Sequence, residues 1–168
     1  MNGLINFTEF DMPLNDTEKQ TMRKHLIESL SGEKAHITID LVVEEFPDDA
    51  INKKIDGIPH SPWDLMEHLR LAQRDILDFI KNPDYREMNW PDDYWPKEQA
   101  SNEEWKASIQ NFLHDRSELI SLINKDDTSV FEPLAHAKEY NLFREIIILA
   151  NHNSYHLGQL LQLKRVLA

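Results

Sequence analysis

The sequence predicts an all-α fold, a four-helix bundle with long inter-helix connections. Apolar residues recur at helical spacing in four long segments, which is typical of helices that bury one face. The chain also has only 4 glycines among its 168 residues, which fits long helices and few tight turns. A chain of this length can bury one substantial core and is short for two, so we expect a single domain over residues 1–168.

The first helix is expected to begin near Asn15, because Asn15 and Glu18 have the spacing of a capping box. It should break or kink at Gly32, since glycine is a poor helix former. Residues 33–46 also carry apolar side chains at helical spacing, so we expect a second helical stretch that Pro47 ends.

The next helix is expected to follow a loop formed by residues 47–60. Ser61 can cap it, and Pro62 occupies its first position, where the missing N–H has no helical partner to lose. Its apolar stripe continues to Ile80, and the helix should end before Pro83.

Residues 82–100 do not read as a helix. At their centre lies the segment Trp90–Pro96, here called the tryptophan loop, with two prolines and three large aromatic residues. A solvent-exposed loop does not normally carry two tryptophans, so we expect this loop to fold back on the bundle. It would then either roof a functional site or cover an apolar edge. Ser101 and Glu104 form another capping box, and the helix they open should reach about Asn124.

The last helix is expected to run from about Tyr140 or Asn141 to Leu167, after an irregular segment at residues 125–138. Two of its residues, His152 and His156, are four apart and therefore lie on one face of the helix. This face also carries leucines, so both imidazoles should point into the core.

A third histidine, His68, lies on the apolar stripe of the helix that begins at Ser61. If the two helices pack side by side, His68, His152 and His156 can meet at one metal ion. Three neutral imidazoles suit Zn²⁺, Ni²⁺ or Fe²⁺ and leave a coordination position open, as in catalytic sites. Taken alone, the His152 and His156 pair has an alternative interpretation as core histidines that hydrogen-bond to backbone carbonyls.

Composition excludes several classes of function. The formal net charge of −12 disfavours nucleic-acid and anionic-membrane partners, which need a basic surface. With 0 cysteines the chain has no disulfide, thiolate ligand or cysteine nucleophile, so a metal site must use His, Asp or Glu. We find no signal peptide and no apolar run of about 20 residues, and therefore expect a cytoplasmic protein.

The segment His152–Leu160 resembles the C-terminal helix signature of the DinB-like (YfiT-like) metalloprotein superfamily. The segment Trp63–Leu69 is similar to that family's helix-two signature, and the order of the histidines is the same. Three further stretches resemble one uncharacterised branch of the family: His60–Trp63, Ala72–Leu77 and Trp90–Pro96. The resemblance implies a four-helix bundle, one divalent metal on His68, His152 and His156, and frequent homodimers.

The family members of known activity resemble transferases and isomerases that use low-molecular-weight thiols, and many others are described only as hydrolases. A metal on three neutral ligands can lower the pKa of bound water to about 7 or bind a thiol as thiolate. Because the chain has no cysteine, such a thiol must be external. We therefore expect a metal-dependent thiol transferase or hydrolase that attacks a small electrophile. The alternative is a non-enzymatic metal-binding or protein-interaction bundle.

No general acid or base can be assigned from the sequence, but several polar residues lie near the histidines. Asp75 and Glu145 are two helical turns from them and are expected to pair with inward-facing cations. Glu67, Gln159 and Tyr155 are nearer. Tyr155 is expected to be a packed core residue, the alternative being a hydrogen-bond donor to substrate.

The remaining histidines are weaker candidates. His36, His60 and His136 lie in the first half of the chain or in predicted loops, and His60 is expected to cap a helix end. His25 and His114 are expected to face solvent.

Overall fold

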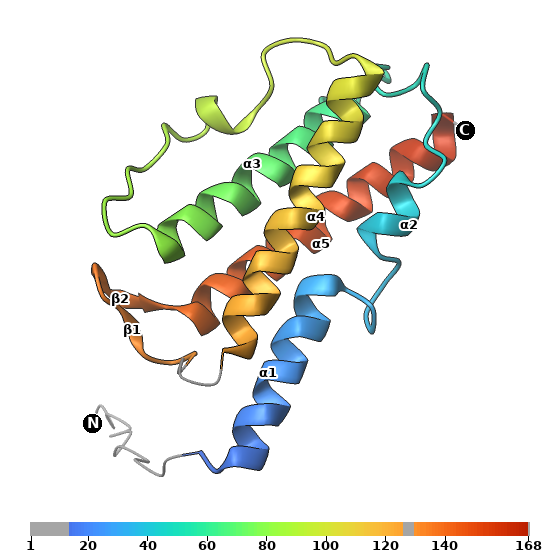
Figure 1. The fold of residues 1–168 in the computed structure, drawn as a ribbon. Helices are drawn as coiled ribbons and strands as arrows, with labels where there is room; N and C mark the ends of the chain where they lie inside the picture. Colours follow the sequence, from blue (N-terminus) through green and yellow to red (C-terminus); the bar gives the residue numbers. More distant parts are fainter. Residues whose placement is uncertain (1–13, 126–129, 168) are drawn as a thin grey trace, which may run out of the picture.

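A computed structural model describes residues 14–125 and 130–167 of the chain. Within these residues the protein is mostly helical, with five α-helices packed together (Figure 1), which confirms the predicted all-α bundle. The elements in chain order are α1 (Asp16–Ser31), α2 (Ile39–Val43), α3 (Pro62–Lys81), the short 3₁₀ helix η1 (Asp92–Tyr94), α4 (Asn102–Asn124), β1 (Pro133–Leu134), β2 (Ala137–Asn141) and α5 (Leu142–Leu167).

The four long helices form the bundle. Helix α3 packs against both α4 and α5, and α1 packs against the same two helices. The short helix α2 lies against α5. Figure 1 shows the segment between α3 and α4 running back along the outer side of α3, so this connection folds onto the bundle as expected. None of the described helices is long and apolar enough to cross a bilayer.

Capping residues place the helix starts where the sequence predicts them. The Asn15 side chain accepts from the Glu18 N–H at 3.0 Å, and the Glu18 carboxylate accepts from the Asn15 N–H at 2.8 Å. Ser61 and Ser101 head complete capping boxes on α3 and α4 in the same way. Gly32 ends α1 with a φ of 75°, a left-handed conformation that favours glycine.

The helix predicted over residues 33–46 is wrong in extent, because only Ile39–Val43 is helical. After the left-handed turn at Gly32, the N–H groups of Ala35 and His36 bond back to the Gly32 carbonyl, which forms a turn in place of a helix. Residues 47–60 form turns, as predicted.

The irregular segment predicted at residues 125–138 is wrong in part, and its residues 126–129 lie outside the described residues. Strand β1 pairs antiparallel with β2 in a small hairpin that leads directly into α5. Helix α5 therefore begins at Leu142, one or two residues later than predicted, because Asn141 still belongs to the strand. The Asn141 side chain then accepts a hydrogen bond from the Arg144 N–H at 2.9 Å.

The core has two apolar halves. One half contains Met66, Leu69 and Leu160, and the other contains Leu77 and Leu149. All five of these side chains are fully buried. At about 25 cal/mol per Å² of buried apolar surface, such packing supplies most of the stability of the bundle.

A buried amide chain crosses the bundle interior. The Gln73 side chain donates to the Phe112 carbonyl at 2.6 Å, and Asn153 donates to Gln73 at 3.3 Å. This chain holds α3, α4 and α5 in register, because a buried amide left unpaired is destabilising by about 1–3 kcal/mol.

Candidate metal centre

The three histidines singled out by the sequence come together between α3 and α5. His68 projects from α3, while His152 and His156 project from adjacent turns of α5, as their i, i+4 spacing requires. One ring nitrogen from each residue lies within 4.8 Å of the corresponding nitrogens of the other two. His68 is 1% exposed, so this cluster is set into the bundle and is not a surface feature.

Hydrogen bonds fix the orientation of two of the rings. His68 Nδ1 lies 2.9 Å from the Tyr94 carbonyl oxygen, and His156 Nδ1 lies 2.8 Å from the Gln159 amide oxygen. Because both partners are acceptors, each Nδ1 carries the proton and donates it. Nε2 of both rings is then left with a free lone pair, which is how histidine ligands are usually oriented in metal sites.

His152 differs from the other two. Its Nε2 lies 3.0 Å from Nε2 of His68, and its buried Nδ1 has no hydrogen-bond partner. The buried amide oxygen of the adjacent Asn153 also lacks a partner. Because His68 carries its proton on Nδ1, the Nε2 atom of His152 donates to the Nε2 atom of His68. The Nδ1 atom of His152 is then deprotonated. If a cation took both Nε2 lone pairs, the His152 proton would move to Nδ1 and make it a donor.

Burial keeps the cluster neutral. Loss of hydration lowers the pKa of His68 to about 4, which outweighs the opposing effect of its bond to the Tyr94 carbonyl. Burial, assisted by the two neighbouring histidines, lowers the pKa of His152 to about 4 as well, while Asn153 opposes this. Burial also lowers the pKa of His156. The imidazoles are therefore neutral near pH 7, each with one unprotonated ring nitrogen, which is the state that binds metals.

The donor set fits a divalent transition metal. Two nitrogens on a tetrahedral zinc ion are about 3.3 Å apart, given bond lengths of about 2.0–2.1 Å. The 3.0 Å between the Nε2 atoms of His68 and His152 is close to this value, and the ligand nitrogen of His156 lies within 4.8 Å of those of the other two histidines. Within the described residues, no carboxylate joins the three histidines as a fourth ligand.

The tryptophan loop packs on the cluster. The Trp95 ring stacks on His68 at 3.9 Å with an interplanar angle of 2°, and His60 stacks on Trp95 at 4.0 Å and 7°. His60 therefore extends this stack of rings and does not cap the helix end as expected. Trp90 lies 6.4 Å from the His68 ring, and its side chain is 64% exposed.

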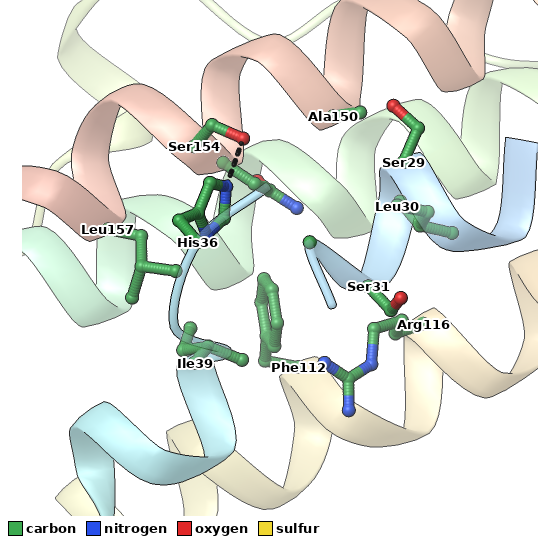
Figure 2. A pocket seen from close by; sticks show the side chains of 12 residues that line it. Ser29, Leu30, Ser31, His36, Ile39, Phe112, Arg116, Ala150, Ser154 and Leu157 are labelled. Atoms are coloured by element: carbon green, nitrogen blue, oxygen red, sulfur yellow. Dashed lines mark hydrogen bonds between the residues drawn. The ribbon is translucent and has the colours of Figure 1, made fainter. Parts of the chain in front are cut away.

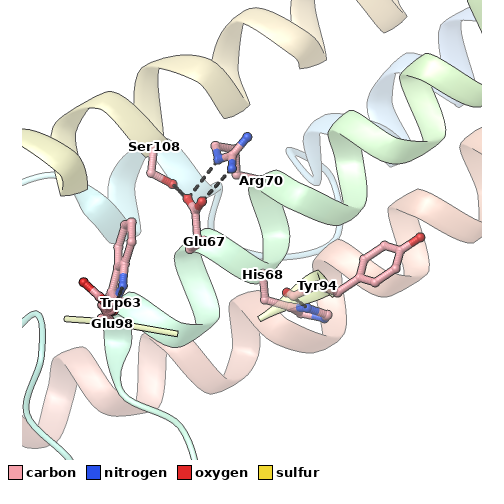
Figure 3. Close-up of polar contacts among 7 residues, drawn as sticks. All are labelled: Trp63, Glu67, His68, Arg70, Tyr94, Glu98 and Ser108. Carbon is pink, nitrogen blue, oxygen red and sulfur yellow. Dashed lines mark hydrogen bonds and ion pairs between the residues drawn. The ribbon is translucent and has the colours of Figure 1, made fainter. Parts of the chain in front are cut away.

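Other polar candidates have partners of their own. Asp75 accepts from two tyrosine hydroxyls, so the expectation of a cationic partner is wrong for this residue. Glu145 pairs with a cation at 2.6 Å, but this cation is the neighbouring Arg144, whose side chain is 47% exposed and so is not inward-facing as expected. The Glu67 carboxylate accepts from Arg70 on its own helix and from the Ser108 hydroxyl on α4 (Figure 3).

Tyr155 is 65% exposed, so its expected place in the core is wrong. Its ring contacts His156 with centroids 4.8 Å apart. Gln159, for which the sequence predicts no specific role, is the direct partner of His156 Nδ1. The spacing i, i+3 on one helix was the available signal for this contact.

His36 lies away from the cluster. It binds the Ser154 hydroxyl through Nε2 at 2.8 Å and the Ile37 carbonyl through Nδ1 at 2.8 Å, beside a small pocket (Figure 2). Ser154 lies halfway between His152 and His156 in sequence, so it projects from the opposite face of α5. His36 thus ties the turn after α1 to α5.

The remaining three histidines also lie outside the cluster. His136 binds the Phe79 carbonyl at 2.8 Å. His25 and His114 are exposed, as predicted.

Comparison with known proteins adds one finding to this geometry. A sequence model of the DinB superfamily matches residues 32–160, which is more than three quarters of the chain. Comparison with curated proteins and with solved structures gave no match. The matched range includes all three histidines of the cluster as well as the tryptophan loop.

Proposed function

This chain belongs to the DinB superfamily, and from that premise we propose that it is a metal-dependent enzyme. In this proposal His68, His152 and His156 hold one divalent ion, with zinc or nickel favoured and iron as a further candidate. The observation that carries it is the convergence of three neutral imidazoles within 4.8 Å. A site with three nitrogen ligands and no protein carboxylate leaves a position for a reactant.

When bound, the ion would supply a positive charge that lowers the pKa of water or of an external thiol and so generates a nucleophile. The chain's own residues prepare the site for this role. The Tyr94 carbonyl and the Gln159 amide hold two imidazoles with Nε2 available. The Trp95 ring covers one face of His68 and shields it from water.

Two exposed aromatic rings flank the cluster where a substrate would approach. The Trp90 ring centroid lies 6.4 Å from that of His68, and the Tyr155 ring contacts the His156 ring. We propose that they form apolar walls for a small electrophile and that the Tyr155 hydroxyl donates a hydrogen bond to it. The attacking group is either water, as in a hydrolase, or an external low-molecular-weight thiol, as in an S-transferase. In line with the family resemblance, we also propose that the chain forms a homodimer, which size-exclusion chromatography with light scattering would test.

The experiment begins with protein purified without chelators and analysed for metal. The loaded protein is then screened with low-molecular-weight thiols against small electrophiles, and with small esters and amides alone. His156→Ala should lose activity by orders of magnitude, whereas His114→Ala, which removes an exposed histidine, should retain it. Activity in a His156→Ala protein shown to be metal-free would refute the metal mechanism. Tight metal binding with no turnover in either screen would favour the alternative of a non-enzymatic metal-binding module.

A further inference from the structure

We propose that Asp75 and Tyr94 act as positioning residues that fix the orientation of the His68 ring for metal binding, although neither would itself bind the metal. This inference rests on the proposed function of the histidine cluster. It assigns roles to a carboxylate on α3 and a phenol hydroxyl in the tryptophan loop that the metal chemistry does not otherwise use.

Tyr94 connects His68 to Asp75 through its two ends. Its backbone carbonyl accepts from His68 Nδ1 at 2.9 Å, and its hydroxyl donates to Asp75 Oδ2 at 2.6 Å. His68 and Asp75 lie about 10 Å apart along α3, because each residue adds about 1.5 Å. The phenol of Tyr94 therefore runs along α3, and Figure 3 shows it extending away from the His68 ring. Tyr94 is 7% exposed, so both contacts are protected from water.

Asp75 anchors the loop at a second point. Its other oxygen, Oδ1, accepts from the Tyr85 hydroxyl at 2.8 Å. Burial and the Asp75 carboxylate together raise the pKa of both tyrosines, so each hydroxyl remains a proton donor. One carboxylate thus holds two points of the segment that leads from α3 to the cluster.

The Asp75 to Tyr94 bond bears on His68 in two ways. First, it holds the Tyr94 carbonyl in place. That carbonyl accepts from His68 Nδ1, and the hydrogen bond between them selects the tautomer in which Nε2 has the lone pair. Second, the Asp75 to Tyr94 bond holds the position of the next residue, Trp95, whose ring stacks on His68 at 3.9 Å. Loss of the Tyr94 hydroxyl should loosen both contacts, and His68 should then present Nε2 less often in the binding orientation.

Tyr85 offers a matched control. Tyr85→Phe removes the same kind of hydrogen bond from the same carboxylate, but the Tyr85 backbone N–H bonds to the Asn82 carbonyl and not to a cluster histidine. If Asp75 served only as a clamp for the loop, Tyr94→Phe and Tyr85→Phe would have similar effects on stability and on metal affinity. A positioning role predicts that only Tyr94→Phe affects the metal strongly.

The zinc dissociation constant is measured by competition with a chromophoric chelator, and the unfolding of chelated protein is measured in urea. We expect Tyr94→Phe to weaken zinc binding by about tenfold, at the lower end of the effect of losing an outer partner of a ligand. We expect Asp75→Asn to weaken zinc binding as well. Tyr85→Phe should change the zinc dissociation constant by less than about twofold. Equal weakening in the two Tyr→Phe variants, or no weakening in Tyr94→Phe, would overturn the proposal.

Nitrogen NMR of the His68 ring in metal-free protein gives a readout that does not depend on the ion. The wild-type chain and Tyr85→Phe should show a single Nδ1–H tautomer, and Tyr94→Phe should show a mixture. A tautomer that is unchanged in Tyr94→Phe overturns the positioning role. If wild-type protein bound no zinc, the proposed function would fall, while loss of the single tautomer in Tyr94→Phe would still support the link between Tyr94 and His68.

Discussion

Acidification should destabilise the metal-free protein well above the range in which carboxylates titrate. His68 and His152 have pKa values of about 4 in the folded protein, against 6.5 for an unperturbed histidine. Between these values the unfolded chain binds protons that the folded chain does not. The free energy of unfolding therefore rises with pH in this window and is lost as pH falls from about 6.5 toward 4.

The size of the effect follows from the two pKa values. For one histidine, integration between pH 8 and pH 5 gives a loss of about 2 kcal/mol, and two histidines give at most about twice that. A chain of this size loses about 2–4 °C in melting temperature for each kcal/mol. The chelated protein should therefore melt about 4–8 °C lower at pH 5 than at pH 8 for each histidine that contributes.

The assay is urea unfolding of chelator-treated protein, followed by circular dichroism at several pH values from 8 to 5. His152→Gln should flatten the pH dependence, because it removes one of the imidazoles whose pKa burial lowers. His114→Gln, at an exposed position, should leave the dependence unchanged. Stability that is constant between pH 8 and pH 5, or that falls equally in wild type and His152→Gln, would refute the assignment of neutral, buried imidazoles to the cluster.

Three further predictions concern the bundle. Chelation should lower the melting temperature but preserve the helical circular dichroism, since the core is apolar and independent of the metal; loss of helix would show that the ion is structural. Leu149→Ala, at a fully buried site, should lower the free energy of unfolding by about 2–5 kcal/mol. Ile148→Ala, at a position 40% exposed, should change it by less than about 1 kcal/mol. Similar losses in the two variants would contradict the assigned helix faces. Gly158→Ala should stabilise α5 by about 0.5–1 kcal/mol, because nothing lies within 4 Å of the added Cβ. Gly32→Ala should destabilise the protein, because its φ is +75° and its Cβ would meet His36 Cε1 at 2.4 Å. Thermal melts of both variants test the contrast.

Local sequence signals were sufficient for the helices that carry the site. The capping boxes at Asn15 and Ser101 and the Ser61 cap followed by Pro62 indicated three helix starts, because these patterns are formed by residues close together in sequence. The i, i+4 spacing of His152 and His156 likewise predicted that both side chains point the same way. The apolar stripes of α3 and α5 predicted that these two histidines and His68 face each other across the core.

The remaining features depend on tertiary contacts that no local pattern encodes. The turn that follows Gly32 is attached to α5 by the bond from His36 to Ser154, which is far away in sequence. The partner of His68 Nδ1 is a backbone carbonyl, which every residue possesses, so its identity could not be read from residue types. The same holds for Asp75, whose tyrosine partners lie in a loop of irregular backbone.

The central claim is that one metal ion binds to three imidazoles with a position left open. X-ray absorption at the zinc edge tests it most directly, on chelator-treated protein reloaded with one equivalent of Zn²⁺. We predict three imidazole nitrogens at about 2.0–2.1 Å with one further light-atom ligand. An imidazole count that stays the same in His68→Ala, or zinc that is not retained after desalting, would contradict the claim.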